Sequence, residues 1–168
     1  MIVRRERPED VPAIRAVVAA AFDAGDGTEP VEVGLLDRLR DDSGWIPRFS
    51  LVAEDGNAVV GHVVATRGDT GGRPALGIGP VAVEPAHQGG GVGTALVHTL
   101  LGAAEACDEE LVVLLGKPAY YGRFGFVPAA ELGVDAPDPA WDRHFQARAF
   151  TPSAPRGPFR YAAPFAQL

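Results

Sequence analysis

The glycine-rich run from His87 to Thr94 (HQGGGVGT) constrains the fold of this chain more than any other stretch. Four glycines fall within five residues, which is typical of a tight turn rather than of a helix or strand. A helical stripe follows at once, formed by Val92, Leu96, Leu100 and Ala103. The apolar run Leu111–Leu115 (LVVLL) then has the length and continuity of a strand buried on both faces. Residues Pro74–Leu115 are therefore predicted to form a βαβ unit with a right-handed crossover.

The strand before the glycine run contains a proline. In Pro74–Glu84 (PALGIGPVAVE), Pro80 has no N–H to donate to a neighbouring strand, and Gly77 and Gly79 weaken pairing. A proline inside a strand is typical of a sheet edge or of a β-bulge, and we predict a bulge at Gly79-Pro80.

The other predicted elements follow from apolar spacing and turn residues. In chain order they are a strand over Ile2–Arg5, a helix beginning at Pro8 and reaching Phe22, a polar loop over Asp23–Pro30, a helix ending near Arg40, a hairpin of Phe49–Glu54 and Ala58–Arg67, a turn over Gly68–Arg73 and a short helix over Ala119–Phe124. Residues 128–168 contain seven of the fifteen prolines, and short strands are predicted there at Phe145–Ala149 and Phe159–Tyr161. We predict a single domain over residues 1–168, with 128–168 as a Pro-rich C-terminal extension of it.

Charge and composition argue against several classes of function. The net charge of −7 at pH 7 disfavours general nucleic-acid binding, which needs clustered lysines and arginines. The chain begins without a signal-like apolar segment and has no apolar run of membrane-spanning length, so no membrane partner is expected. The single cysteine, Cys107, fits a reducing, cytoplasmic location. The four histidines lack metal-ligand spacing, so no metal is expected.

Two phosphate-binding motifs do not match the glycine run. A P-loop needs a lysine after its last glycine, and the dinucleotide fingerprint would need a third glycine where Leu96 stands. Two explanations remain open. The run is either a bare strand-to-helix turn, or an anion site in which the partnerless amides of the helix N-terminus approach a pyrophosphate without Cβ atoms in the way. In the second case the hydroxyl of Thr94 would add a contact.

The glycine run also resembles a family motif. Gln88-x-x-Gly91-x-Gly93 is similar to the Q/R-x-x-G-x-G/A motif of the GCN5-related N-acetyltransferases (GNAT). As in that family, the motif lies between a predicted strand and a predicted helix.

Two further motifs carry the same resemblance. Tyr121-x-x-x-Gly125-Phe126, within KPAYYGRFGF, resembles the segment after the fifth strand of the GNAT superfamily. A Gly-x-x-x-Tyr-x-x-x-Phe pattern near the end of the chain is similar to that of one bacterial branch of predicted small acetyltransferases. That pattern consists of Gly157, Tyr161 and Phe165.

The resemblance implies both a fold and a reaction. The fold is α/β, with a mixed central sheet of about six to seven strands, about four flanking helices, and splayed fourth and fifth strands. The reaction moves acetyl from acetyl-CoA to a primary amine by direct attack through a tetrahedral intermediate. The implied contacts to acetyl-CoA are Val81, Ala82, Val83, Gln88, Gly89, Gly90, Gly91, Val92, Gly93, Thr94 and Tyr120. Tyr121 is implied as the general acid, because a positioned phenol can protonate the departing thiolate.

The base that would deprotonate the amine is left open. Some GNAT members carry a glutamate early in the fourth strand, but ALGIGPVAV contains none. The candidates are Glu32, His62, Glu84 and His87, or a chain of waters, and each side chain also has a purely structural explanation. The sequence does not indicate whether the acceptor is a small-molecule amine or a peptide amine. It also does not indicate whether the protein is a monomer or a homodimer.

Two other functions remain open beside the transferase. An acyl-CoA-binding regulatory or sensor domain would keep the glycine loop without the transfer reaction. A non-enzymatic interaction module would use the glycines only for the turn.

Overall fold

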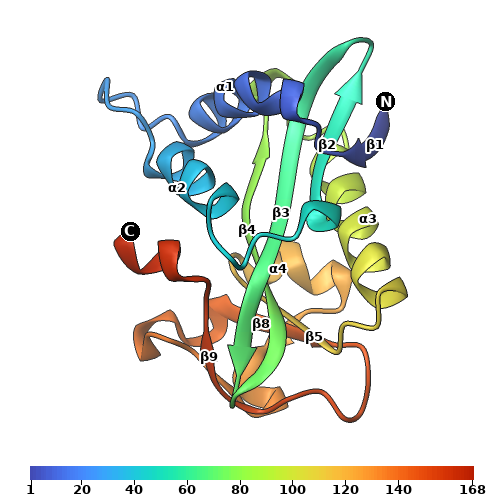
Figure 1. Cartoon of the computed structure of the whole chain (residues 1–168), viewed down its shortest axis with the longest axis vertical. Helices are drawn as coiled ribbons and strands as arrows, with labels where there is room; N and C mark the ends of the chain where they lie inside the picture. Colours follow the sequence, from blue (N-terminus) through green and yellow to red (C-terminus); the bar gives the residue numbers. More distant parts are fainter.

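A mixed sheet of nine strands forms the centre of the computed structural model, which describes residues 1–168 (Figure 1). The strands run in the order β1-β2-β3-β4-β5-β8-β6, with β9 paired to β3 and β7 paired to β9. Their bounds are β1 (Ile2–Arg5), β2 (Ser50–Asp55), β3 (Ala58–Thr70), β4 (Arg73–Val83), β5 (Leu111–Leu115), β6 (Val127–Pro128), β7 (Val134–Asp135), β8 (Phe145–Ala149) and β9 (Gly157–Arg160). Because β6 and β7 are only two residues long, the longer strands match the predicted number of six to seven.

The chain has four α-helices, as predicted. They are α1 (Val11–Phe22), α2 (Val31–Arg40), α3 (Val92–Ala106) and α4 (Pro118–Tyr121). Helix α3 covers one face of the sheet, and α1 and α2 cover the other (Figure 1). Apolar residues at helical spacing fill both interfaces: Ile14 and Val18 of α1 and Leu96 and Leu100 of α3 are at most 1% exposed. Burial of each such side chain stabilises the fold by about 1.5–3 kcal/mol.

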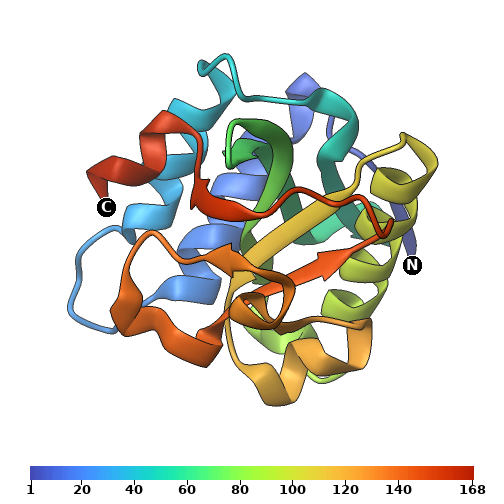
Figure 2. The same ribbon diagram turned by 90° about the horizontal axis from the view of Figure 1, so that it is seen from below.

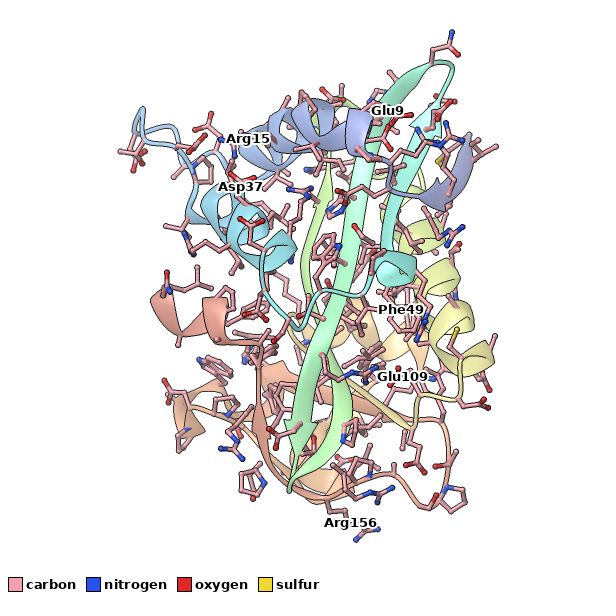
Figure 3. The ribbon with its side chains drawn as sticks, in the orientation of Figure 1. Glu9, Arg15, Asp37, Phe49, Glu109 and Arg156 are labelled. Atoms are coloured by element: carbon pink, nitrogen blue, oxygen red, sulfur yellow. The ribbon has the colours of Figure 1, made fainter.

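Side-chain contacts connect the helices, strands and loops to one another. Arg15 of α1 and Asp37 of α2 point toward each other and form an ion pair (Figure 3). Glu109, in the loop after α3, accepts two hydrogen bonds from the Arg67 guanidinium of β3, at 2.6 and 2.7 Å (Figure 3). Phe49, just before β2, is fully buried in the core under α3 (Figure 3).

The predicted βαβ unit is confirmed. Strand β5 runs parallel to β4, with Leu76 opposite Val112, and α3 makes the crossover between them. The other pairings along the main path of the sheet are antiparallel, including β1–β2, β2–β3, β3–β4 and β5–β8.

The predicted bulge in β4 is also present, and it changes which side chains share a face. The register of β3–β4 passes from Val63 opposite Val81 to Ala65 opposite Ile78, so β4 carries one extra residue, and the Gly79-Pro80 peptide is cis. As a result Val81 packs on the α3 side of the sheet with Ile78 although they are three residues apart.

Strands β4 and β5 separate immediately after the bulge begins. Their last paired residues are Ile78 and Leu114, whereas β4 continues to Val83 with no partner on that edge. The predicted splay of the fourth and fifth strands is therefore confirmed.

Residues 128–168 contribute more to the sheet than the term extension suggests. Strand β8 lies between β5 and β6, and Phe145 and Phe159 are each only 1% exposed. The end of the chain, drawn in red, lies beside α2 (Figure 2). The C-terminal segment therefore contributes strands to the sheet and packs beside α2.

The predicted turn over Gly68–Arg73 was wrong in its extent. Strand β3 continues to Thr70, and only Gly71 and Gly72 form the turn. Gly68 lies inside the strand, and the close approach of β9 explains why this residue is a glycine. A Cβ there would lie 2.5 Å from the Arg160 carbonyl oxygen. None of the helices has the length and apolar character needed to cross a membrane.

Candidate active site

The glycine run forms the loop that leads from β4 into α3. After the short 3₁₀ turn Pro85–His87, Gly89 and Gly91 adopt φ angles of +76° and +89°. An L-residue pays roughly 1–2 kcal/mol in this left-handed region, so the backbone itself requires glycine at both positions. A Cβ on either glycine would meet nothing within 4 Å, which shows that the outer side of the loop is open.

The backbone amides of this loop have no partners within the chain. From Gly89 to Thr94 no N–H donates a hydrogen bond, and no side chain caps α3. The first intrahelical bond is donated by Ala95 to the Gly91 carbonyl. Unpaired amides at a helix N-terminus carry partial positive charge, so they form a ready anion site.

One packing contact and one hydrogen bond fix these amides in place. The Val92 side chain is buried against the core, where a Cβ on Gly61 of β3 would come within 2.9 Å of it. The Gln88 side-chain amide donates to the Val83 carbonyl oxygen at 3.1 Å. Gln88 therefore joins the loop to the end of β4, and Val92 offers only its backbone to a ligand.

Three of the implied contacts to acetyl-CoA lie on the open part of β4. Val81, Ala82 and Val83 are opposite Val63, His62 and Gly61 of β3, respectively. No strand pairs with their other edge, since β5 ends its pairing at Ile78. That edge runs from the bulge to the glycine loop.

Tyr120 and Tyr121 of α4 lie near this open edge, and their rings contact each other with centroids 4.9 Å apart. The phenol oxygen of Tyr120 approaches the N-terminus of α3, where a Cβ on Gly93 would be 2.9 Å away. The Arg123 guanidinium stacks on the Tyr120 ring at 4.5 Å from its centroid. Tyr121 instead lies against Gly116, where a Cβ would come within 2.4 Å of its ring.

Tyr121 lines a cavity with a volume of about 750 Å³. The cavity begins at the gap between the strands, where it is lined by Ile78, Gly79, Pro80, Val81, Leu114 and Leu115. Burial raises the pKa of Tyr121 to about 12, and the neighbouring Tyr120 contributes to the increase. The phenol therefore keeps its proton at neutral pH, as a proton donor must.

The contributions of α1 and of the C-terminal segment to the far wall of the cavity were not predicted from the sequence. This wall consists of side chains from α1, α2 and the C-terminal segment, including Phe22, Leu35, Trp141, Tyr161 and Phe165. The tail pattern that includes Tyr161 and Phe165 was a signal for this wall, but nothing in it indicated what the two rings face.

Among the candidate bases, only Glu32 lines this cavity. It lies in the first turn of α2, is half-buried, and has no hydrogen-bond or ion-pair partner. Glu84 and His87 instead pair with each other at 2.5 Å, near the glycine loop. Asp138, which the sequence did not single out, lies on the rim of the cavity.

His62 belongs to a buried polar network away from the cavity. It is fully buried, and its Nε2 lies 2.9 Å from the Ser50 hydroxyl and 3.2 Å from a Glu6 carboxylate oxygen. Arg40 donates to the other Glu6 oxygen at 2.8 Å. The His62 Nδ1 has no partner, which favours the neutral tautomer protonated at Nε2.

The network sets opposite protonation tendencies for its two titratable members. Burial alone would raise the pKa of Glu6, but hydrogen bonds from His62, Arg40 and Ser50 outweigh it and hold that pKa at about 2. Burial lowers the pKa of His62, and the attraction of Glu6 only partly offsets this. Glu6 is thus charged and His62 neutral near pH 7, which is a structural arrangement rather than a base exposed to substrate.

Comparison with known proteins identifies the family. The model of the acetyltransferase (GNAT) family matches residues 11–126, which span α1 to the segment after α4. This chain belongs to the GNAT acetyltransferase family. The match includes the glycine loop, the open edge of β4 and both tyrosines of α4.

Individual GNAT relatives cover almost the whole chain. The uncharacterized N-acetyltransferase YhbS of Escherichia coli K12 is 30% identical over 159 residues, which are 94% of this chain and 92% of YhbS. The crystal structure of YhbS in complex with CoA has a TM-score of 0.88 over 98% of this chain and 91% of that chain, at 29% identity. A GNAT acetyltransferase from Brucella melitensis, in complex with acetyl-CoA, has a TM-score of 0.80 at 35% identity over 98% and 97% of the two chains.

Proposed function

We propose that this GNAT acetyltransferase transfers acetyl from acetyl-CoA to a primary amine within the cavity between β4 and β5. The observation that carries the proposal is the uninterrupted row of unpaired amides from Gly89 to Thr94, which leads along the open edge of β4 to Tyr121. The two relatives crystallised with acetyl-CoA and with CoA support the same cosubstrate.

The glycine loop fits a pyrophosphate on three counts. Its amides are unpaired, its outer side is open at Gly89 and Gly91, and the dipole of α3 favours a negative charge there. The unpaired edge at Val81–Val83 is suited to amide groups of a pantetheine arm, because such groups can replace the missing strand.

The chemical step needs one proton donor and one proton acceptor. The amine nitrogen attacks the thioester carbonyl carbon, a C–N bond forms, and the C–S bond breaks as the tetrahedral intermediate collapses. Tyr121 gives its phenolic proton to the departing thiolate. Because burial raises the pKa of Tyr121, the phenolate left behind is strongly basic and takes up a proton again, which balances the proton released by the amine and restores Tyr121 for the next turnover.

We assign the proton acceptor to Glu32. It is the half-buried carboxylate of the cavity that has no partner, and it lines the same cavity as the strand gap and Tyr121. The negative charge of Glu32 also attracts the ammonium form of the acceptor before the proton is removed.

Calorimetric titration with acetyl-CoA and with CoA, followed by a screen of primary amines for CoA release, tests the proposal. Saturable binding and amine-dependent CoA release are expected. Binding of acetyl-CoA without turnover of any amine would favour a sensor domain. Absence of binding at millimolar concentrations, together with no shift of the unfolding temperature by CoA, would favour an interaction module.

A further inference from the structure

The part of the cavity beyond Tyr121 is lined by half-buried aromatic side chains. Phe22 lies at the end of α1, Trp141 in the 3₁₀ turn Pro139–His144, and Phe165 in the 3₁₀ turn Ala163–Gln167. Tyr161 lies between them, with its ring centroid 4.7 Å from that of Phe165 and 6.4 Å from that of Trp141. Aromatic rings that converge on a concave surface without a covering side chain are typical of a pocket for an apolar group.

This aromatic wall is held rigidly at the strand gap. The Tyr161 ring packs on β4, where a Cβ on Gly77 would lie 2.7 Å from it. Its other side contacts Phe159 edge-on, at 4.7 Å between centroids and an interplanar angle of 85°. Because Gly77 is two residues before the bulge, the wall begins beside the point where the thioester would lie.

The charges around the wall suit a single ammonium group. Arg160 is the one cationic side chain that lines the cavity, and it pairs with Asp69 at 3.3 Å. Glu32 is unpaired, and Asp138 uses one oxygen to accept a hydrogen bond from the Ala140 amide at 2.8 Å. Fifteen of the twenty-one residues that line the cavity are hydrophobic, so a second charge on the ligand would have few partners.

We propose that the acceptor is a small arylalkylamine, that is, a primary amine joined to an aromatic ring by a short alkyl chain. This inference rests on the proposed function of the same cavity. The amine lies between Glu32 and Tyr121, and the aromatic ring packs against the wall of Trp141, Tyr161 and Phe165.

The first experiment compares acceptors at saturating acetyl-CoA. Phenethylamine, ethanolamine, spermidine and a short peptide with an N-terminal alanine are offered to the wild-type protein, and CoA release is followed. We expect kcat/KM for phenethylamine to exceed the value for each of the others by at least about tenfold, which corresponds to about 1.4 kcal/mol. Preference for ethanolamine, spermidine or the peptide would overturn the inference.

The second experiment tests the wall itself. In Trp141→Ala, KM for phenethylamine is expected to rise about tenfold, while KM for acetyl-CoA stays constant and Trp141→Phe recovers most of the loss. Phe165→Leu keeps an apolar side chain but removes a ring, and it is expected to raise the same KM. An equal loss for phenethylamine and ethanolamine in these variants would contradict a ring-binding role.

Direct binding separates this inference from the proposed function. Phenethylamine is titrated calorimetrically into the protein saturated with CoA, and saturable binding that weakens in Trp141→Ala is expected. If CoA binds and polar amines are acetylated but phenethylamine does not bind, the inference fails and the proposed function stands. If CoA itself does not bind, the proposed function fails.

Discussion

The phenol oxygen of Tyr120 lies beside Gly93, so close that a Cβ on that glycine would be only 2.9 Å from it. Gly93 is in the first turn of α3, among the unpaired amides, and Tyr120 precedes Tyr121 in α4. The contact therefore joins the loop proposed to hold the pyrophosphate to the helix that carries the proposed acid.

Gly93→Ala is expected to weaken acetyl-CoA binding without weakening the fold. The new methyl group displaces Tyr120 from the end of α3, and KM for acetyl-CoA should rise about tenfold. Alanine also favours a helix over glycine by about 1 kcal/mol, so the unfolding temperature of the ligand-free protein should not fall. Steady-state kinetics and thermal unfolding check the two effects separately.

Two variants control this prediction. Gly102→Ala lies in the same helix, where a Cβ meets nothing within 4 Å, and should leave KM for acetyl-CoA unchanged. Adding Tyr120→Phe to Gly93→Ala removes the crowded oxygen and should restore part of the affinity. If the double variant binds acetyl-CoA no better than Gly93→Ala alone, the steric account is wrong.

Tyr121→Phe is expected to reduce kcat by about 10²–10⁴-fold, because the departing thiolate loses its proton donor. The ring still packs against Gly116, so acetyl-CoA binding and thermal stability should change little. Calorimetry and turnover with the same amine measure the two quantities. Unchanged turnover would remove Tyr121 from the chemical step.

Gly116→Ala should reduce kcat for a different reason. A Cβ at this position would lie 2.4 Å from the Tyr121 ring, so the ring must leave its place in the strand gap. We expect a loss in kcat approaching that of Tyr121→Phe, and little additional loss when the two changes are combined. Strictly additive losses in the double variant would show that Gly116 does not act through Tyr121.

Glu32→Gln is expected to change the pH dependence of kcat/KM as well as its size. Without the carboxylate, only amine that is already neutral in solution can react, so the rate should climb with pH up to the pKa of the amine. A loss of about 10²-fold at neutral pH, which shrinks as pH rises, is the expected profile. A uniform loss at every pH would indicate that Glu32 only binds the acceptor.

The Glu6 network predicts loss of stability in acid. The pKa of Glu6 is about 2 in the fold against an ordinary value of 4.5, so the unfolded chain binds the proton more readily as pH falls through this interval. Its contribution, roughly 3 kcal/mol, is fully present above about pH 4.5 and is lost as pH approaches 2. The lowered pKa of His62 acts in the same direction below its ordinary value of 6.5.

Denaturant unfolding across this pH range checks the prediction. Glu6→Gln should be less stable than the wild type at pH 7, because Arg40 loses its charged partner. The two proteins should converge in stability toward pH 2. A wild-type stability that is constant from pH 7 to pH 3 would contradict the assigned protonation states.

Local signals accounted for most of the predicted fold. The glycine run, Pro80 and the apolar run Leu111–Leu115 each report on their own neighbourhood, and they gave the loop, the bulge and the parallel pairing correctly. The prediction failed where distant segments meet. Gly68 resembles a turn residue on its own, but β9 packs against it from ninety residues further along the chain.

The candidate site divides in the same way. Tyr120, Tyr121 and the glycine loop carry recognisable short motifs, so they could be named in advance. The surroundings of Glu32 and His62 could not be foreseen, because a glutamate or histidine gives no sequence signal of what lies around it. Only the tertiary arrangement leaves Glu32 unpaired in a cavity and buries His62 beside Glu6.

The loop with the open edge of β4 and the aromatic wall of the cavity come from different parts of the chain. The loop and open edge proposed to face the cosubstrate come from residues 81–94, whereas the aromatic wall comes mainly from residues 139–167. Substitutions in the wall can therefore accumulate during evolution without disturbing the loop. Under the proposed roles, such substitutions change the choice of acceptor and leave the site for acetyl-CoA intact.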